Sequence, residues 1–118
     1  MMNFSSIRRL FKALGYSWDG LRVAAKNEAS FQLEIAFSIV LIPVAFFLHV
    51  GVPGKALLIG SVLLVLIVEL LNTAVEAIVD RISLEPHPLA KKAKDTGSAA
   101  VFLTIILACC VWGTILFS

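Results

Sequence analysis

Apolar residues fill three long segments of the chain. The last, residues 97–117, has no charged residue, and the middle one, residues 55–80, begins with the almost unbroken apolar run ALLIGSVLLVLIV. The first, residues 31–50, is polar at its start and contains Pro43. A helix needs about 20 predominantly apolar residues to cross a bilayer. The pattern therefore predicts three membrane-spanning helices, and the short link GVPG favours a tight antiparallel pair of the first two.

Residues 4–28 follow a different pattern, in which apolar and basic positions alternate at helical spacing. The apolar positions are Phe4, Ile7, Phe11, Leu14, Trp18, Leu21 and Ala25, and the basic ones are Arg8, Arg9, Lys12, Arg22 and Lys26. An apolar stripe with a basic opposite face is typical of a helix that lies in the membrane interface. We therefore expect an amphipathic surface helix before the first span, with a break or bend at Gly15.

Composition supports a single all-α membrane domain over residues 1–118. The chain is 59% apolar and 15% charged, whereas soluble domains average roughly half apolar and about a quarter charged. The net charge of +2, without a basic run among aromatics, predicts no nucleic-acid partner. Basic residues gather before the first span and in the expected loop 81–96, while Lys55 marks the other side. The positive-inside rule then predicts a cytoplasmic N-terminus and 81–96 loop, and a C-terminus outside.

The middle segment carries a polar stripe of Glu69, Asn72, Glu76 and Asp80. On a helix of 3.6 residues per turn, these four side chains project within about 80° of one another. Hydrogen bonds or ion pairs between helices are the structural alternative. Ionisable residues inside a membrane are costly and usually functional, so three acids on one stripe indicate a functional site.

The start of the third span supplies the opposite charge. Lys91, Lys94, Asp95 and Ser98 are spaced so that they share one face of a helix entering that span. A basic membrane anchor is the alternative for the lysines alone. Beside a carboxylate cluster, however, they predict a site for a magnesium-bound polyphosphate, because carboxylates hold Mg²⁺, Mg²⁺ bridges phosphate oxygens and lysine neutralises the remaining charge.

Glu28 lies at the entrance of the first span. Because the first two spans run in opposite directions, Glu28 is expected at about the depth of Glu76, where the two carboxylates can share one cation. The alternative is an exposed glutamate paired with Lys26 or Arg22. Glu69, the deepest acid of the stripe, suits a general base, whereas Glu76 lies further out, where a hydrated cation is reached with less penalty.

The runs KALGYSWDGLRVAAKNEASFQLE, IVELLNTAVEAIVDRI and AKKAKDTGSAAV resemble the prokaryotic diacylglycerol kinase family over Arg9 to Trp112. The resemblance implies a homotrimer of three-span subunits, each with an N-terminal surface helix, in the bacterial inner membrane. It also implies transfer of the γ-phosphoryl group of Mg-ATP to the hydroxyl of diacylglycerol at the cytoplasmic interface, giving phosphatidic acid. The run TGSAAV is more similar to this branch than to the related undecaprenol kinases, which typically carry an AAGAV-like run there.

Matching positions imply a role for individual residues. Glu69 falls on the general base, Glu28 and Glu76 on the metal ligands, and Asn72 and Asp80 on supporting positions. The implied ATP contacts are Arg9, Tyr16, Glu28, Glu76, Glu85, Pro86, His87, Lys94 and Asp95. The implied lipid contacts are Arg9, Ala13, Leu14, Gly15, Tyr16, Ser17, Trp18, Arg22, Val23, Ala24, Ala25, Ser30, Phe31, Gln32, Leu33, Glu34, Phe47, Lys55, Glu69, Ser98 and Trp112.

Three spans are too few to enclose both a nucleotide and a lipid, so the site is expected between subunits. Small residues let helices approach closely in membranes, and the chain provides them at Gly97, Ser98, Ala99 and Ala100. Three alternatives remain at this stage: an undecaprenol kinase, a small oligomeric channel or carrier, and a membrane scaffold. A channel needs a continuous polar lining, for which the outer halves of the first two spans offer little beyond Ser38 and Ser61.

Overall fold

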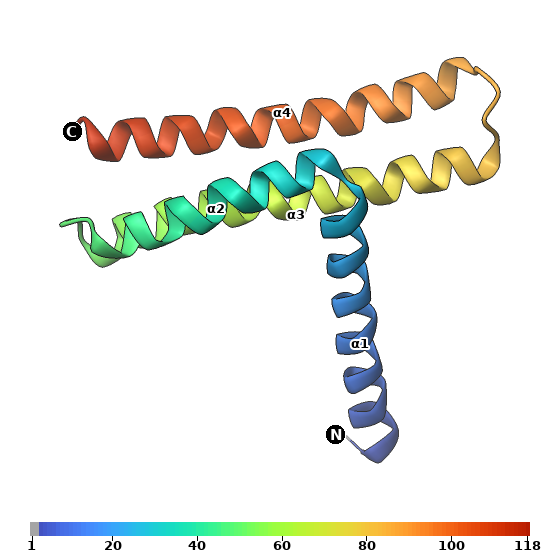
Figure 1. Cartoon of the computed structure of the whole chain (residues 1–118), viewed down its shortest axis with the longest axis horizontal. Coiled ribbons are helices and arrows are strands. Elements are labelled where there is room, and N and C mark those ends of the chain that lie inside the picture. The colour runs from blue at the N-terminus through green and yellow to red at the C-terminus, as the bar shows by residue number, and fades with distance from the viewer. Residues whose placement is uncertain (1–2) are drawn as a thin grey trace.

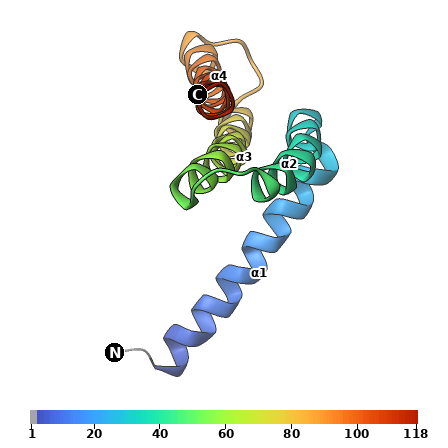
Figure 2. The same cartoon turned by 90° about the vertical axis from the view of Figure 1, so that its left-hand side faces the viewer.

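A computed structural model describes residues 3–118, which form four helices and no strand. Their bounds are α1 Phe4–Asn27, α2 Ala29–Phe47, α3 Val52–Ile82 and α4 Pro88–Leu116. Residues 1 and 2 of the predicted domain lie outside the described residues. Helices α2, α3 and α4 run alongside one another, while α1 projects away from them (Figures 1 and 2). The last three are long and apolar enough to cross a membrane, so the predicted all-α membrane fold is confirmed.

Helix α1 begins with a side-chain cap, because the Asn3 carboxamide accepts a hydrogen bond from the Ser6 N–H at 2.9 Å. It then continues to Asn27 without interruption, so the bend expected at Gly15 is absent. Large apolar side chains such as Trp18 stand exposed along it. Because the helix runs across the direction of the other three (Figure 2), these side chains are placed to lie in the interface of a membrane that α2–α4 cross.

A sharp corner at Glu28 separates α1 from α2. Glu28 has an extended backbone, with φ −104° and ψ 109°, and ends α1. The last carbonyls of a helix have no partner within the helix. Here the Gln32 side chain donates to the carbonyls of Ala25 at 2.9 Å and Lys26 at 3.2 Å. The corner therefore places Glu28 where the surface helix meets the first span.

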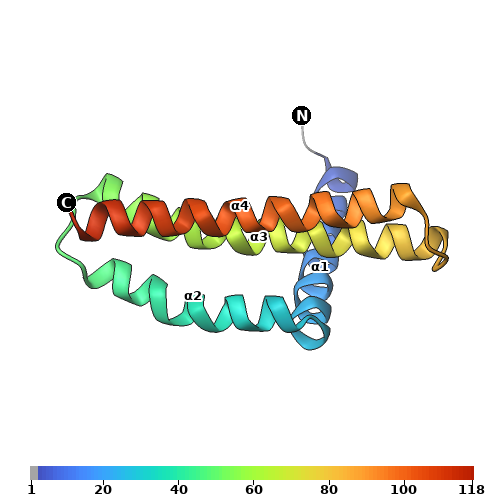
Figure 3. The ribbon, with the colours of Figure 1, turned by 90° about the horizontal axis from the view of Figure 1, so that it is seen from above.

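Helices α2 and α3 form the expected antiparallel pair (Figure 3), with bounds shifted by two to three residues from the predicted 31–50 and 55–80. Pro43 lies inside α2, which continues to Phe47. Pro53 lies in the first turn of α3, where its missing N–H does no harm. The Lys55 ammonium donates to the Phe46 carbonyl at 2.7 Å. That bond closes the α2–α3 turn by capping the end of α2.

The connection between α3 and α4 is much shorter than the predicted loop over residues 81–96. Only residues 83–87 are non-helical, and α4 begins at Pro88. The His87 side chain accepts a hydrogen bond from the Leu89 N–H at 3.1 Å and caps the helix, while proline is favoured at the first helical position. At the far end, the Trp112 indole N–H donates to the Leu58 carbonyl at 3.2 Å and holds α4 against α3.

The polar stripe of α3 faces the other helices. Glu69 and Asn72 are only 7% and 8% exposed. Many large apolar side chains point outwards instead, such as Leu71 at 61% exposed, as expected for a surface that faces lipid. Glu69 and Asn72 are therefore directed into the bundle and away from lipid, as a functional site requires.

Candidate active site

A cavity of about 650 Å³ lies between α2, α3 and α4. Most of its polar residues lie towards one end of the cavity: Glu28, Ser30, Glu34, Glu69, Asn72, Glu76 and Ser98. Towards the other end the lining is, except for Ser38, apolar or weakly polar: Phe37, Leu41, Val62, Val65, Val101, Ile105, Ala108 and Cys109. We call the first group the acid end and the second the apolar end. A cavity divided in this way suits a ligand with a polar head and a long apolar tail.

Two carboxyl groups meet at the acid end. Glu34 from α2 and Glu69 from α3 both line it. One carboxyl oxygen of Glu34 is buried and has no hydrogen-bond partner among the described residues. An ionised carboxylate accepts hydrogen bonds, so the pair offers acceptors to a ligand hydroxyl in the cavity.

The acid end also holds a donor set suited to a divalent cation. Glu28, at the α1–α2 corner, and Glu76, on α3, line the same cavity. Mg²⁺ is usually bound by one or two carboxylates and completes its shell with phosphate oxygens and water, so these two residues fit it. Within residues 3–118, no three His, Cys, Asp or Glu side chains gather into a metal-binding group.

Asn72 connects the acids of α3. Its side-chain N–H donates to a Glu76 carboxylate oxygen at 3.2 Å. The two residues are one helical turn apart, and Asp80 follows after a further turn. Each turn of four residues advances about 6 Å along the helix, so the stripe extends from the acid end towards the α3–α4 connection.

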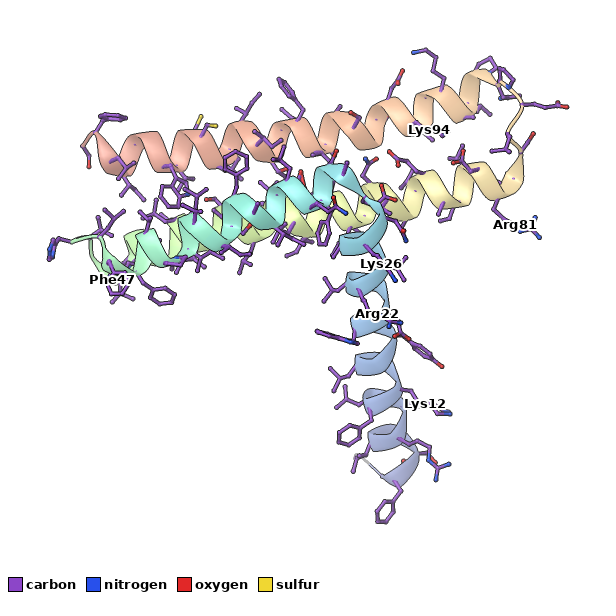
Figure 4. All side chains as sticks on the ribbon, in the orientation of Figure 1. Lys12, Arg22, Lys26, Phe47, Arg81 and Lys94 are labelled. Carbon is purple, nitrogen blue, oxygen red and sulfur yellow. The ribbon has the colours of Figure 1, made fainter. Side chains whose placement is uncertain are left out.

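A second cavity, of about 610 Å³, lies at that connection. The Lys94 ammonium pairs with the Asp80 carboxylate at 2.7 Å, linking α4 to α3, and both side chains are about half exposed. Figure 4 shows Lys94 on α4 at the same end of the bundle as Arg81. The cavity lining includes Asp80, Glu85, Pro86, His87, Lys91, Lys94 and Asp95. It thus brings together all the nucleotide contacts implied for the connection and for α4.

Lys91 and Asp95 form a neighbouring ion pair, one turn apart on the charged start of α4 and ahead of its apolar part. The hydrogen bond from Lys91 to Asp95, together with their opposite charges, raises the pKa of Lys91. Both side chains are largely exposed, so a ligand phosphate has access to this lysine.

The single chain does not bring every predicted residue to the cavities. Arg9 and the stretch Ala13–Trp18 lie on the exposed surface of α1, with Tyr16 71% exposed, and line neither cavity. Phe47 lies at the end of the bundle opposite Lys94 (Figure 4). Lys55 and Trp112 share that end, and their polar groups are bound to backbone carbonyls.

The apolar end of the cavity was not predicted from the sequence, because an apolar side chain in a span can face lipid, another helix or a cavity. A helical signal was present, however. Phe37 and Leu41 follow Glu34 by three and seven residues, and Val101 and Ile105 follow Ser98 at the same spacing. Residues at that spacing share one helix face, so the polar positions could have identified the apolar lining.

Comparison with known proteins identifies the family of this chain. The family profile described as prokaryotic diacylglycerol kinase matches residues 15–116. The chain belongs to the prokaryotic diacylglycerol kinase family. The diacylglycerol kinase of Pseudomonas aeruginosa is 50% identical over 95% of this chain and 91% of the relative. The Escherichia coli K12 enzyme is 48% identical over 98% and 95%, and that of Haemophilus influenzae 45% identical over 99% of both chains. Membership confirms the resemblance and favours a lipid kinase over the channel and scaffold alternatives.

Proposed function

We propose that the chain transfers the γ-phosphoryl group of ATP to the free hydroxyl of diacylglycerol, giving ADP and phosphatidic acid. The observation that carries this proposal is the division of the larger cavity into an acid end and an apolar end. A diacyl lipid has the same division, with a hydroxyl at its head and hydrocarbon behind it. The three relatives named above are each called diacylglycerol kinase, which supports this acceptor over a polyprenol.

In the proposed reaction Glu69 is the general base. The lipid hydroxyl lies beside the Glu34–Glu69 pair, and Glu69 takes its proton as the oxygen attacks the γ-phosphorus. The new O–P bond forms while the bond from the γ-phosphorus to the β,γ-bridging oxygen breaks, and ADP leaves. Phosphoryl transfer depends mainly on positioning and charge neutralisation, which buried, fixed side chains provide.

The second cavity is proposed to hold the nucleotide. Lys94 and Lys91 supply positive charge for the polyphosphate, and residues 85–87 supply a wall at the α3–α4 connection. Glu28 and Glu76 would hold Mg²⁺, which supplies neutralisation of phosphate charge. On α3, Asp80 lies between Glu76 and the α3–α4 connection. A nucleotide bound at the connection would therefore extend its phosphates towards the acid end.

The working form is proposed to be a homotrimer whose sites are shared between subunits. Arg9 and Tyr16 lie away from the cavities of their own chain, which supports their contribution to a neighbouring subunit's site. We also propose that the N-terminus and the α3–α4 connection face the cytoplasm and that the C-terminus faces out. This orientation in the bacterial inner membrane places the nucleotide cavity on the side where ATP is available.

A phosphorylation assay with purified protein in mixed micelles tests the proposal. Wild type should phosphorylate diacylglycerol in the presence of Mg-ATP and act much more slowly on undecaprenol. Glu69→Gln keeps the size of the side chain but removes the base, so turnover should fall by at least about a hundredfold, as for loss of a general base. Asp19→Asn, an exposed carboxylate on α1 at 63% side-chain exposure, is the control and should keep its activity. Full turnover by Glu69→Gln would refute the assigned role.

The adjacent cysteines provide an independent test of the lipid position. Cys109 lines the cavity, whereas Cys110, its neighbour in sequence, does not. Each is left as the single thiol by replacing the other with alanine, and alkylation by a lipid-soluble maleimide is followed by mass spectrometry. Diacylglycerol without ATP should slow alkylation of Cys109 and leave Cys110 unaffected. Equal protection of both thiols would argue against a lipid in this cavity.

A further inference from the structure

Gly97 on α4 lies directly against the Asn72 side chain of α3. A Cβ atom added to Gly97 would lie 2.2 Å from the Asn72 side-chain oxygen and 3.3 Å from its carbonyl carbon. Among the glycines of residues 3–118, the next closest such contact is 3.4 Å, at Gly54. The hydrogen on the Gly97 Cα therefore occupies space that no side chain could share with the Asn72 amide.

The Asn72 amide is fixed in one orientation. Its nitrogen donates to Glu76, which as a carboxylate can only accept. Its oxygen consequently faces Gly97, where it is buried and has no hydrogen-bond partner among the described residues. A Cα–H to oxygen contact is weak, so little but the shape of the Gly97 backbone holds the oxygen there.

We propose that Gly97 is a positioning residue for the cation site: it leaves room for the Asn72 amide to lie with its nitrogen on Glu76. The inference rests on the proposed function through the cation role of Glu76. A methyl group at residue 97 would force the amide to rotate, and rotation would withdraw the donor from Glu76. The carboxylate would then be free to turn away from Glu28 and from the shared cation.

The experiment measures Mn²⁺ binding by electron paramagnetic resonance, with full-length protein in micelles and ADP present. Partners that orient a metal ligand typically contribute about 10- to 100-fold to metal affinity, so Gly97→Ala should weaken Mn²⁺ binding by about that factor. Gly113→Ala is the matched control on the same helix, because nothing lies within 4 Å of its added Cβ. It should bind Mn²⁺ like wild type.

A glycine that serves only for helix packing would behave differently. Gly97→Ala would then lower the denaturant midpoint of the protein while the folded fraction bound Mn²⁺ with wild-type affinity, and this result would overturn the inference. Glu76→Gln separates the inference from the proposed function. If Glu76→Gln weakens Mn²⁺ binding and Gly97→Ala does not, the role of Gly97 is wrong; if neither does, the cation role of Glu76 is wrong as well.

The double variant Asn72→Ala/Gly97→Ala keeps the test decisive even if Gly97→Ala does not fold. Asn72→Ala removes both the donor to Glu76 and the atoms that the new methyl group would strike. The single variant Asn72→Ala should weaken Mn²⁺ binding by about 10- to 100-fold. Adding Gly97→Ala to it should change the affinity no further. A further loss of affinity in the double variant would show that Gly97 acts on something other than Asn72 and would overturn the inference.

Discussion

Replacing Trp112 with phenylalanine should destabilise the contact between α3 and α4, apart from any effect on the lipid contact that the family resemblance implies for Trp112. The indole N–H donates to the Leu58 carbonyl at 3.2 Å, joining residues 54 positions apart. Leu58 itself has no exposed surface, so water cannot replace the lost donor from that side. Phenylalanine keeps an aromatic ring at residue 112 and removes the hydrogen bond.

The expected loss is about 1 kcal/mol in the free energy of unfolding. Side-chain hydrogen bonds between membrane helices contribute about 0.6 kcal/mol on average and at most about 1.7 kcal/mol. The larger penalty for an orphaned buried acceptor does not apply, because Leu58 lies inside α3 and its carbonyl also accepts the helix bond from the backbone N–H four residues on. The Ser61 hydroxyl is a further donor to it, at 2.9 Å. The smaller ring adds a modest loss of packing.

The assay is unfolding by sodium dodecyl sulfate in mixed micelles, combined with the KM for diacylglycerol measured on the same preparations. Phe117→Leu, a change near the end of the chain at a side chain that is 89% exposed, is the control and should unfold like wild type. The double variant Ser61→Ala/Trp112→Phe should lose about the sum of its single variants, since the Leu58 carbonyl keeps its backbone donor within α3. The reasoning is refuted if Trp112→Phe unfolds like wild type while its KM for lipid rises about tenfold.

Two further predictions concern polar contacts at opposite ends of the bundle. Lys55→Met removes the ammonium that caps the Phe46 carbonyl at 2.7 Å. It should cost about 1 kcal/mol of unfolding free energy, measured by the same denaturation. This is below the usual range of about 1.5–3 kcal/mol for a charged hydrogen bond, because the site is partly exposed. Asp80→Asn and Lys94→Gln should couple by less than about 1 kcal/mol in a double-mutant cycle of unfolding, because their ion pair is half exposed. Lys94→Gln alone should nevertheless raise the KM for ATP about tenfold, equivalent to about 1.4 kcal/mol. An unchanged KM would remove Lys94 from the proposed nucleotide site.

The sequence was sufficient to predict the features that depend on local pattern. The three spans follow from segment length, and the inward stripe of Glu69 and Asn72 follows from helical spacing, because burial inside a membrane strongly selects where polar residues can face. The amphipathic α1 followed in the same way. Its continuity through Gly15 did not, since one glycine in a helix costs only about 1 kcal/mol and need not bend it.

The start of α4 shows how one local signal has two meanings. The charge before Gly97 assigns residues 81–96 to a connection, while the spacing of Lys91, Lys94, Asp95 and Ser98 predicts a helix there. Pro88 is a favoured first helical residue, and the His87 side chain completes the cap. Lys91, Lys94 and Asp95 do lie on this helix, so their relative positions are set before a nucleotide binds.

Contacts between helices could not be predicted from the spacing of residues along the sequence. The geometry of the acid end depends on these contacts. The spacing of Asn72 and Glu76 reveals that they share a face, but whether Gly97 touches that amide depends on how α4 is rotated and how closely it approaches α3. At one end, the hydrogen bond from Trp112 to the Leu58 carbonyl holds α4 against α3. At the other end, the ion pair between Lys94 and Asp80 does so. Gly97 lies between these two attachment points. An amide held against a glycine there makes the orientation of Glu76 sensitive to a displacement of α4 that is too small to disturb either attachment. The stability of the bundle and the geometry of the proposed cation site therefore depend on different contacts along the same pair of helices, and variants can separate them.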